Sequence, residues 1–179
     1  MSNEATNKIY VIDTNVLIEL WKWHPFKFSL DFWTKLENLL EQGKWVLLDV
    51  VVNEVKYAPE LQAWLKNQKK KKLVMEIDDN VRNRATEINE QYQMIDGVSG
   101  NSEGDTYIIA YAEINKLSIF SRESNRRADG DLFKIPDVCQ KLNIKCIKNM
   151  VKFMEEMGFE NINCANINLT TTETARLLK

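Results

Sequence analysis

The sequence predicts an α/β protein of three layers, α/β/α, in which helices cover both faces of a mostly parallel sheet of about five strands. Short β-rich apolar runs alternate with longer segments of helical spacing from Ile9 to Phe159. The runs are continuous rather than alternating, as in strands buried on both faces. A chain of 179 residues is also long enough to bury one core without disulfides or structural metals.

Five runs rich in β-branched and aromatic residues predict the strands. Each is short and bounded by polar or turn-forming residues, so none extends to the length of a helix. The expected strands are residues 9–13, 44–49, 72–77, 118–122 and 144–148.

Apolar residues at helical spacing predict seven helices between these strands and after them. Ser29 or Asp31 is expected to cap the second helix, and Asp78 or Asp79 the fourth. Pro59 is expected to interrupt the third, because the residue before a proline disfavours helical geometry. The expected helices are residues 14 to about 20, 29–43, 51–68, 78–93, 105–117, 135–143 and 150–159.

The helix over 105–117 is the most apolar and is expected to be central. Pro136 opens the helix that follows it, and Gly43 and Gly158 are expected to end theirs. Turn-forming residues predict loops over 21–26, 96–105 and 123–131.

One domain is expected over residues 1–160, followed by a polar tail, 161–179, with a short helix. The net charge of −2 and the pI of about 5.6 exclude a generally basic nucleic-acid binder, so any such affinity must come from local patches. Cys139, Cys146 and Cys164 are odd in number and have no CxxC spacing, which favours a reducing compartment. With no signal peptide and no membrane-length apolar run, we expect a cytoplasmic protein that does not enter a membrane.

Four carboxylates fall where parallel strands end or the following helices begin. Asp13 ends the first strand, Glu54 follows the second, Asp105 starts the central helix and Glu123 follows the fourth strand. Because these positions share one rim of a parallel sheet, we expect the four side chains to converge. Crowded carboxylates repel one another, and a hard divalent cation, Mg²⁺ or Mn²⁺, relieves that repulsion. The pattern therefore predicts a site for metal-dependent phosphodiester hydrolysis.

The same segments resemble the motifs of PIN-domain endoribonucleases, the VapC-like and PIN-like prokaryotic group. The matching stretches are YVIDTNVLIEL, VVNEV, GDTYIIAYA, FSRE and KIPDVCQKLNIKCI, and the resemblance covers about residues 8–158. It implies a PIN-like fold and a metal-dependent endoribonuclease with an RNA substrate.

By position, the resemblance assigns metal binding and catalysis to Asp13, Glu54, Asp105 and Glu123. It implies that Asn15 orients Asp13 or the attacking water and that Ser121 orients Glu123. The fourth acid of the family is often Asp, and here it is Glu123, one methylene longer. Whether one or two metals bind stays open.

Simpler interpretations exist for the acids. Asp13 and Asp105 both suit a helix cap, although Glu54 and Glu123 suit that role poorly. Either of two loop acids, Asp129 and Asp131, is an alternative to Glu123, and Glu103 is a further candidate to assist the metal. The single histidine, His24, excludes histidine-centred catalysis and a histidine-rich zinc site.

Two groups of basic residues are candidates for contact with RNA. Arg122, Arg126 and Arg127 flank a proposed catalytic acid and are expected to bind phosphates. The lysine run 69–72 suits a solvated helix end better than a steering patch.

The family analogy suggests that the ribonuclease is the toxin of a toxin–antitoxin pair, with a protein antitoxin as partner and a homodimer as a possible assembly. The alternative is a catalytically weak or inactive PIN-like module that binds RNA or a protein. A haloacid dehalogenase-like phosphatase is disfavoured, because Asn15 stands where that fold has a second aspartate.

Overall fold

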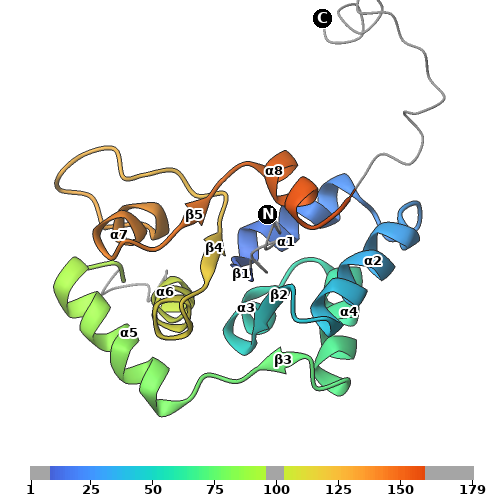
Figure 1. The fold of residues 1–179 in the computed structure, drawn as a ribbon, viewed down its shortest axis with the longest axis horizontal. Helices are drawn as coiled ribbons and strands as arrows, with labels where there is room; N and C mark the ends of the chain where they lie inside the picture. The colour runs from blue at the N-terminus through green and yellow to red at the C-terminus, as the bar shows by residue number, and fades with distance from the viewer. Residues whose placement is uncertain (1–8, 96–102, 160–179) are drawn as a thin grey trace, which may run out of the picture. The chain divides into compact units, whose positions relative to one another are not determined.

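The computed structural model describes residues 9–95 and 103–159. Contacts divide the chain into two units, residues 1–149 and 150–179, and the first unit contains the whole sheet. The sheet has five strands, all parallel, in the order β3-β2-β1-β4-β5 (Figure 1). The predicted class, an α/β fold with a mostly parallel sheet of about five strands, is confirmed.

The strands lie where the apolar runs predicted them, and each is shorter than its run. In the central strand every residue is buried, and Tyr10 pairs with Trp45 on one side and Ser118 on the other. This double coverage explains why the run is apolar at successive positions. The strands are β1 Tyr10–Ile12, β2 Trp45–Leu48, β3 Val74–Met75, β4 Ser118–Phe120 and β5 Cys146–Ile147.

Eight helices occur in the described ranges. In Figure 1, α1, α2 and α4 lie to the right of the row of strands, and α5, α6 and α7 lie to its left. Because the connections run outward from β1 in two opposite directions, right-handed crossovers place their helices on opposite faces. The helices are α1 Thr14–Trp23, α2 Leu30–Glu41, α3 Asp49–Glu54, α4 Pro59–Lys70, α5 Asp79–Tyr92, α6 Glu103–Asn115, α7 Ile135–Lys141 and, in the second unit, α8 Met150–Glu156.

Helix α6 is the central helix, as its apolar sequence predicted. It packs on β1 and β4 and against α5 and α7. Its buried face includes Ile108, Ile109, Ala110 and Ala112. This packing fixes the first turn of α6 against the carboxyl ends of the central strands.

The interruption and caps of the helices were predicted in part. The break before Pro59 is confirmed, and Asp78 caps α5 by accepting a hydrogen bond from Val81 N at 2.9 Å. Ser29 occupies the N-cap position of α2, but its side chain makes no capping hydrogen bond, and Asp31 lies inside the helix. The expectation that one of these two side chains caps α2 was wrong.

Two boundaries differ from the expectation. Helix α1 continues to Trp23, through residues expected to form a turn, and ends only before Pro25. Helix α6 begins at Glu103, two residues earlier than expected, because acidic residues suit a first helical turn. The rest of the expected loop, residues 96–102, and the tail 161–179 lie outside the described residues. No helix in the described residues has the length and apolar character needed to cross a membrane.

Candidate functional site

The candidate site begins at the centre of the sheet, where the strand order reverses. Asp13 follows β1 and Ser121 follows β4, and these two strands are neighbours. The Ser121 hydroxyl donates a hydrogen bond of 2.7 Å to Asp13 Oδ2. Both residues are buried, with 3% of Asp13 and none of Ser121 exposed. In open parallel sheets such a reversal is where ligands bind, outside the carboxyl ends of the strands.

The charge of Asp13 is poorly compensated. Burial raises the pKa of its carboxyl to about 6, and the hydrogen bond from Ser121 opposes the rise. The nearby carboxylates of Glu123 and Glu54 raise this pKa further, and no cation in the described residues lowers it. A buried, unpaired carboxylate is costly, so this position is unfavourable unless a positive charge binds there.

The Asp13 side chain does not act as the helix cap that the simpler interpretation expected. Asp13 occupies the N-cap position of α1, but its carboxylate makes no capping hydrogen bond. The backbone N–H of Asn15 lies near the Asp13 carboxylate and lowers its pKa. Its position is not that of a capping hydrogen bond. A role in stabilising α1 therefore does not explain why the carboxylate is buried.

Glu54, the last residue of α3, joins the rim through two contacts. Thr14 Oγ1 donates a hydrogen bond to Glu54 Oε2. On the other side lies the buried backbone of Gly104, where an added Cβ would overlap the Glu54 carboxylate. Glycine permits this close approach, which sequence analysis missed. The contact places the first turn of α6 beside Glu54.

Asp105 lies in that first turn, directly after Gly104, and is half-buried. It is the third residue of α6, so it does not occupy the N-cap position that the simpler interpretation gave it. Glu103, the other acid of this turn, is exposed and accepts a hydrogen bond of 3.1 Å from the Tyr107 hydroxyl.

Glu123 is tied to the same serine and to the start of α7. Its backbone N–H donates to Ser121 Oγ at 3.1 Å, and its Oε2 accepts from Ile135 N at 3.1 Å. Lys134 Nζ lies 4.0 Å from its Oε1. Contacts thus connect all four motifs in one series: Gly104 to Glu54, Glu54 to Thr14, and Asp13 through Ser121 to Glu123.

The two polar residues assigned to orientation have specific partners. Ser121 was expected to orient Glu123, but its hydroxyl donates to Asp13 and accepts from the Glu123 backbone rather than contacting the Glu123 carboxylate. Asn15 was expected to act on Asp13 or on water, and its Oδ1 accepts from Arg122 N at 3.2 Å. The observed role of Asn15 is therefore to hold the segment after β4 against α1.

The carboxylates are near one another but do not form a closed cluster. Within residues 9–95 and 103–159, no three His, Cys, Asp or Glu side chains are placed to hold a metal ion. Thr14 holds one oxygen of Glu54, and Ile135 N holds one of Glu123. The second oxygen of each carboxylate takes no part in these two hydrogen bonds.

Sequence analysis gave no role to one acid of this rim. Asp49 follows β2 as the first residue of α3, and its buried Oδ1 has no hydrogen-bond partner in the described part of the chain. The available signal was the carboxylate that interrupts the apolar run WVLLDVVV. By contrast, Asp131 accepts from Arg127 N and Ala128 N, and Asp129 pairs with Arg126, so both alternatives to Glu123 already serve the loop after β4.

The three arginines proposed to bind RNA differ in the partners that their guanidinium groups have within the protein. Arg122 donates to Glu19 Oε2 at 2.7 Å and to Lys148 O at 2.6 Å. Arg126 donates to Asp129 O at 3.0 Å and lies 4.0 Å from the centroid of the Phe133 ring. The exposed guanidinium of Arg127 has no partner in the described residues.

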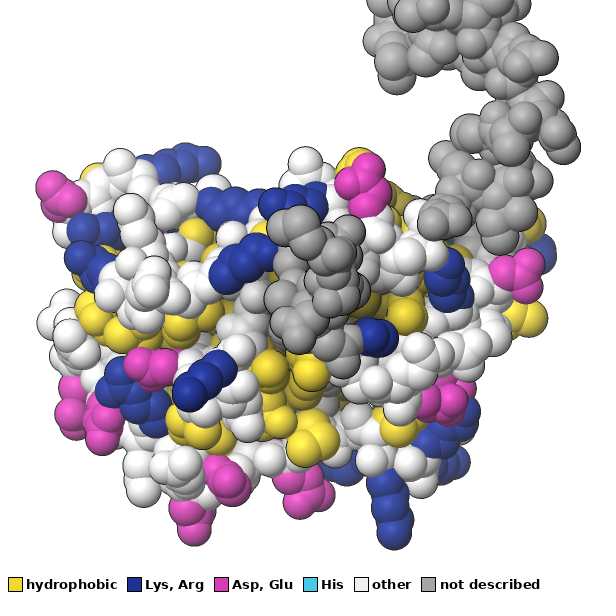
Figure 2. All heavy atoms as spheres, in the orientation of Figure 1, with side chains coloured by type: hydrophobic (Ala, Val, Ile, Leu, Met, Phe, Trp, Pro, Cys, Tyr) yellow, Lys and Arg dark blue, Asp and Glu magenta, His cyan; other side chains and the backbone are white. Residues whose placement is uncertain are grey.

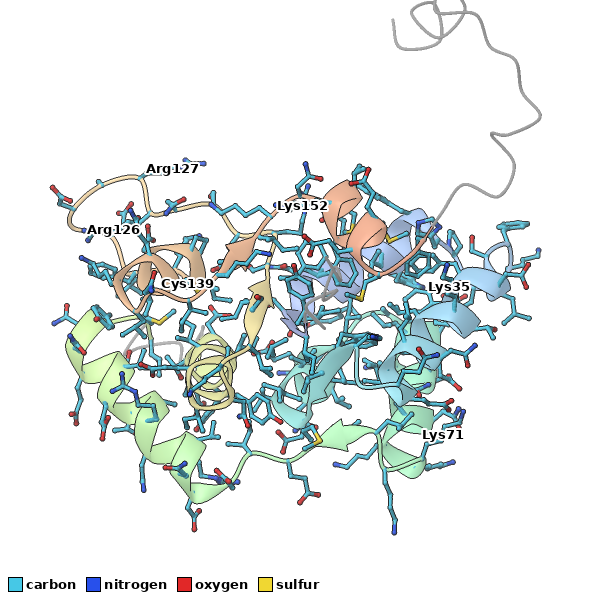
Figure 3. All side chains as sticks on the ribbon, viewed as in Figure 1. Lys35, Lys71, Arg126, Arg127, Cys139 and Lys152 are labelled. Carbon is cyan, nitrogen blue, oxygen red and sulfur yellow. The ribbon has the colours of Figure 1, made fainter. Side chains whose placement is uncertain are left out.

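Basic side chains gather at the upper left of the face in Figure 2, over β5 and the loop between β4 and α7. Figure 3 places Arg126 and Arg127 in that region and Lys71 far from them, at the lower right. Lys71 forms ion pairs with Glu37 and Glu41. This agrees with a lysine run that serves the end of α4.

Two cavities adjoin the acids. One, of about 470 Å³, is lined by Asn15, Ile18, Glu19, Lys22, Trp23 and Arg122. The second, of about 370 Å³, lies in the loop after Glu123 and is lined largely by polar and basic residues.

Comparisons with known proteins give a family and several distant structural neighbours, two of which are described first. A toxin–antitoxin complex from Klebsiella pneumoniae aligns with a TM-score of 0.42 and 16% identity over 64% of this chain and 86% of that one. VapBC2 from Rickettsia felis, bound to a DNA fragment from its promoter, aligns with a TM-score of 0.45 and 16% identity over 78% of this chain and 97% of that one.

No curated protein matches the chain. The model of one family, described as "Domain of unknown function (DUF4411)", matches residues 10–160, which is most of the sequence. The chain therefore belongs to the DUF4411 family.

Proposed function

We propose that this chain is a PIN-like, Mg²⁺- or Mn²⁺-dependent endoribonuclease that acts in the cytoplasm as the toxin of a toxin–antitoxin pair. The observation that carries the proposal is the Asp13 carboxylate, buried at the reversal of strand order without a compensating cation. The motif resemblance supplies the reaction and the substrate class.

The donors at this rim suit a hard cation. Carboxylate oxygens are the ligands that Mg²⁺ and Mn²⁺ prefer, and the added charge would offset the repulsion that Glu54 and Glu123 exert on Asp13. We assign metal binding to Asp13, Glu54, Asp105 and Glu123. The ion would lower the pKa of the attacking water and neutralise charge on the phosphodiester.

The remaining residues position these ligands. The hydrogen bond from Ser121 fixes Oδ2 of Asp13. It thereby fixes the orientation of the whole carboxylate and leaves Oδ1 for the ion. Thr14 holds Glu54 on the side of the chain that carries Asp13. Asn15 fixes the backbone of Arg122, and with it the position of Glu123 one residue later. Burial of Asp13 and Ser121 keeps bulk water from this part of the rim.

The direct experiment is cleavage of labelled single-stranded RNAs by the purified chain, with Mn²⁺ and with EDTA. We expect Mn²⁺-dependent endonucleolytic products that Asp13→Asn does not give. Asp31→Asn, a change of the same kind at an exposed position of α2, is the matched control and should cleave normally. Equal cleavage by wild type and Asp13→Asn would contradict the proposal.

The second candidate function is a PIN-like module that binds RNA or a protein without cleaving RNA. It is favoured because a hydrogen bond ties Glu123 Oε2 to Ile135 N, and because no three acids in residues 9–95 and 103–159 are placed to hold an ion. This module should bind RNA equally well with and without Mn²⁺ and leave it intact.

The toxin role requires a protein antitoxin, since a free ribonuclease endangers the cell that makes it. We expect the partner to cover the acidic rim and to place an arginine or lysine among the carboxylates. Expression of the chain alone should slow growth, and Asp13→Asn should be harmless at equal protein levels. Equal toxicity of the wild type and Asp13→Asn would contradict the enzymatic function. No effect of either protein on growth would contradict the toxin role.

A further inference from the structure

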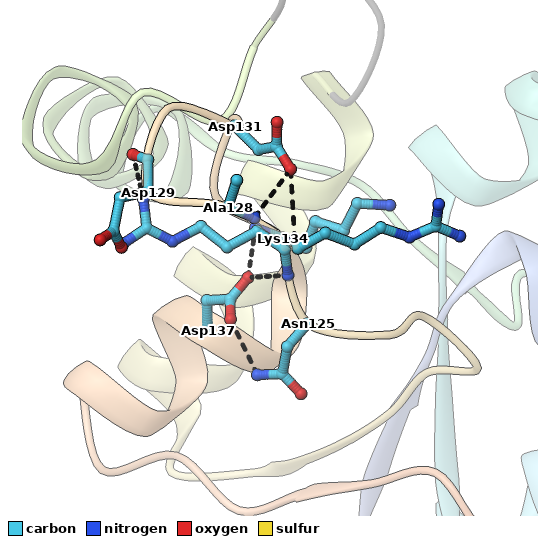
Figure 4. A network of polar contacts seen from close by, with 8 residues as sticks. Asn125, Ala128, Asp129, Asp131, Lys134 and Asp137 are labelled. Atoms are coloured by element: carbon cyan, nitrogen blue, oxygen red, sulfur yellow. Dashed lines mark hydrogen bonds and ion pairs between the residues drawn. The ribbon is translucent and has the colours of Figure 1, made fainter.

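The loop between Glu123 and α7 has a fixed shape because two aspartates bind its backbone (Figure 4). Asp137 accepts hydrogen bonds from Arg126 N at 3.0 Å, Lys134 N at 3.1 Å and Asn125 Nδ2 at 2.8 Å. Asp131 accepts from Arg127 N at 3.2 Å and Ala128 N at 3.1 Å. These backbone amides are already bound, so they are not available to an anion at this loop.

The basic side chains of this loop differ in whether other residues of the protein already bind them. The guanidinium of Arg126 is bound by Asp129 and packed over Phe133, so its charge is partly neutralised within the loop. In the described residues Arg127 has no side-chain partner, and the one acidic partner of Lys134 is Glu123, at 4.0 Å. Two cations therefore remain open to a ligand.

Both open cations line the cavity of about 370 Å³. Ser124 and Asn125 add a hydroxyl and an amide to its wall, and Asp131 is its one carboxylate. A volume of this size is within the range of cavities that bind small molecules. With Arg126, Arg127 and Lys134 against Asp131, the formal charge of the lining is positive, which suits an anion.

The cavity adjoins the proposed catalytic acids through covalent and polar links. Ser124 follows Glu123 directly, and Lys134 and Ile135 both contact the Glu123 carboxylate. A strand bound at the acids would thus place a neighbouring phosphate at this cavity.

We propose that this cavity binds a backbone phosphate next to the scissile one in single-stranded RNA. Arg127 is the main ligand, and Lys134, which moves from Glu123 to the phosphate, is the second. The inference rests on the proposed function and identifies where its substrate lies. Arg122 and Arg126 hold the protein structure instead and make no primary phosphate contact.

The test measures RNA binding without cleavage. In an Asp13→Asn background, Arg127→Gln should weaken binding of a labelled single-stranded RNA about tenfold, as expected for one charge-assisted contact. It should also reduce the slope of log affinity against log salt by about 0.7. Arg82→Gln removes the same charge from an exposed position of α5 and should leave both quantities nearly unchanged.

A kinetic readout separates the subsite from the catalytic site. In the otherwise wild-type chain, Arg127→Gln should raise KM and leave kcat nearly unchanged, because the residue contacts a flanking phosphate. Equal effects of Arg127→Gln and Arg82→Gln on binding would overturn the subsite while leaving the nuclease intact. Failure of the Asp13→Asn chain to bind RNA, with no cleavage by wild type, would overturn both.

Discussion

Asp13 and Asp137 both accept hydrogen bonds from the segment that follows β4, yet their surroundings affect a negative charge in opposite ways. Burial and the nearby Glu123 and Glu54 raise the pKa of Asp13 to about 6, against one hydrogen bond from Ser121. Partial burial also raises the pKa of Asp137, but hydrogen bonds from Arg126 N, Asn125 and Lys134 N outweigh it and lower that pKa.

The difference separates a structural carboxylate from a candidate functional one. The protein itself compensates the charge of Asp137, and the result is a defined loop. It does not compensate the charge of Asp13, which points to a positive ligand from outside the chain. Substitutions at the two positions should therefore have different effects on activity and opposite effects on stability.

The largest expected difference is in catalysis. Asp13→Asn should reduce Mn²⁺-dependent RNA cleavage by about a thousandfold, the upper range for loss of one group that stabilises transition-state charge. Asp137→Asn should reduce it by no more than about tenfold, since it alters only the loop that carries the flanking subsite. Initial cleavage rates on one labelled RNA measure the two variants. Similar losses of rate would show that the two aspartates do not differ in their role in catalysis.

The second difference is in stability without metal at pH 7.5. A rise in the pKa of Asp13 from 3.8 to about 6 corresponds to a penalty of about 3 kcal/mol for the ionised form in the folded state. Asp13→Asn should recover up to that amount, whereas Asp137→Ala should cost about 1–2 kcal/mol, because it removes the hydrogen bonds that Arg126 N, Lys134 N and Asn125 make to this carboxylate. Urea unfolding measures both free energies.

The pH dependence of this effect has a definite sign. The folded-state pKa of Asp13 lies above the unfolded value, so the folded state keeps its proton longer as the pH rises. Wild-type stability relative to Asp13→Asn should therefore fall between about pH 4 and pH 6 and stay constant above that. If the free energies of unfolding of the two proteins differed as much at pH 3.5 as at pH 7.5, Asp13→Asn would stabilise the fold by some other means.

A smaller effect concerns the contact that joins α6 to the rim. Gly104→Ala should displace the Glu54 carboxylate, because the new Cβ would overlap it, and should lower the cleavage rate more than the stability, since the end of this exposed side chain can move. Gly130→Ala is the matched control, since an added Cβ there meets nothing within 4 Å. Equal melting temperatures for the two variants, with equal cleavage rates, would mean that the approach of Gly104 to Glu54 is unimportant.

The sequence predicted the sheet and most helices because those signals are local. Apolar runs marked all five strands, and Pro59 and Asp78 marked a break and a cap that the structure contains. The expected parallel arrangement also predicted that segments distant in sequence meet at one rim. Contacts between Gly104, Glu54 and Thr14, and between Asp13 and Ser121, fit that expectation.

Details that depend on side-chain direction were beyond the sequence. No local signal showed that the Ser121 hydroxyl points to Asp13 rather than to Glu123, or that Arg122 is bound by Glu19. The bare composition of SRESNRR likewise did not distinguish Arg126, bound within its loop, from the open Arg127. Burial and partner geometry decide these roles, and both arise only from the tertiary fold.

Metal-linked melting of the wild-type chain and Asp13→Asn tests the central claim most directly. At a hundredfold excess over its Kd, Mn²⁺ should stabilise the wild type by about 2.7 kcal/mol, which is a rise in Tm of about 5–10 °C for a chain of this size. Asp13→Asn should melt at the same temperature with Mn²⁺ and with EDTA, and Asp31→Asn should respond as the wild type does. A wild-type Tm that is indifferent to Mn²⁺ and Mg²⁺, or an equal rise in Asp13→Asn, would contradict a metal site built on Asp13.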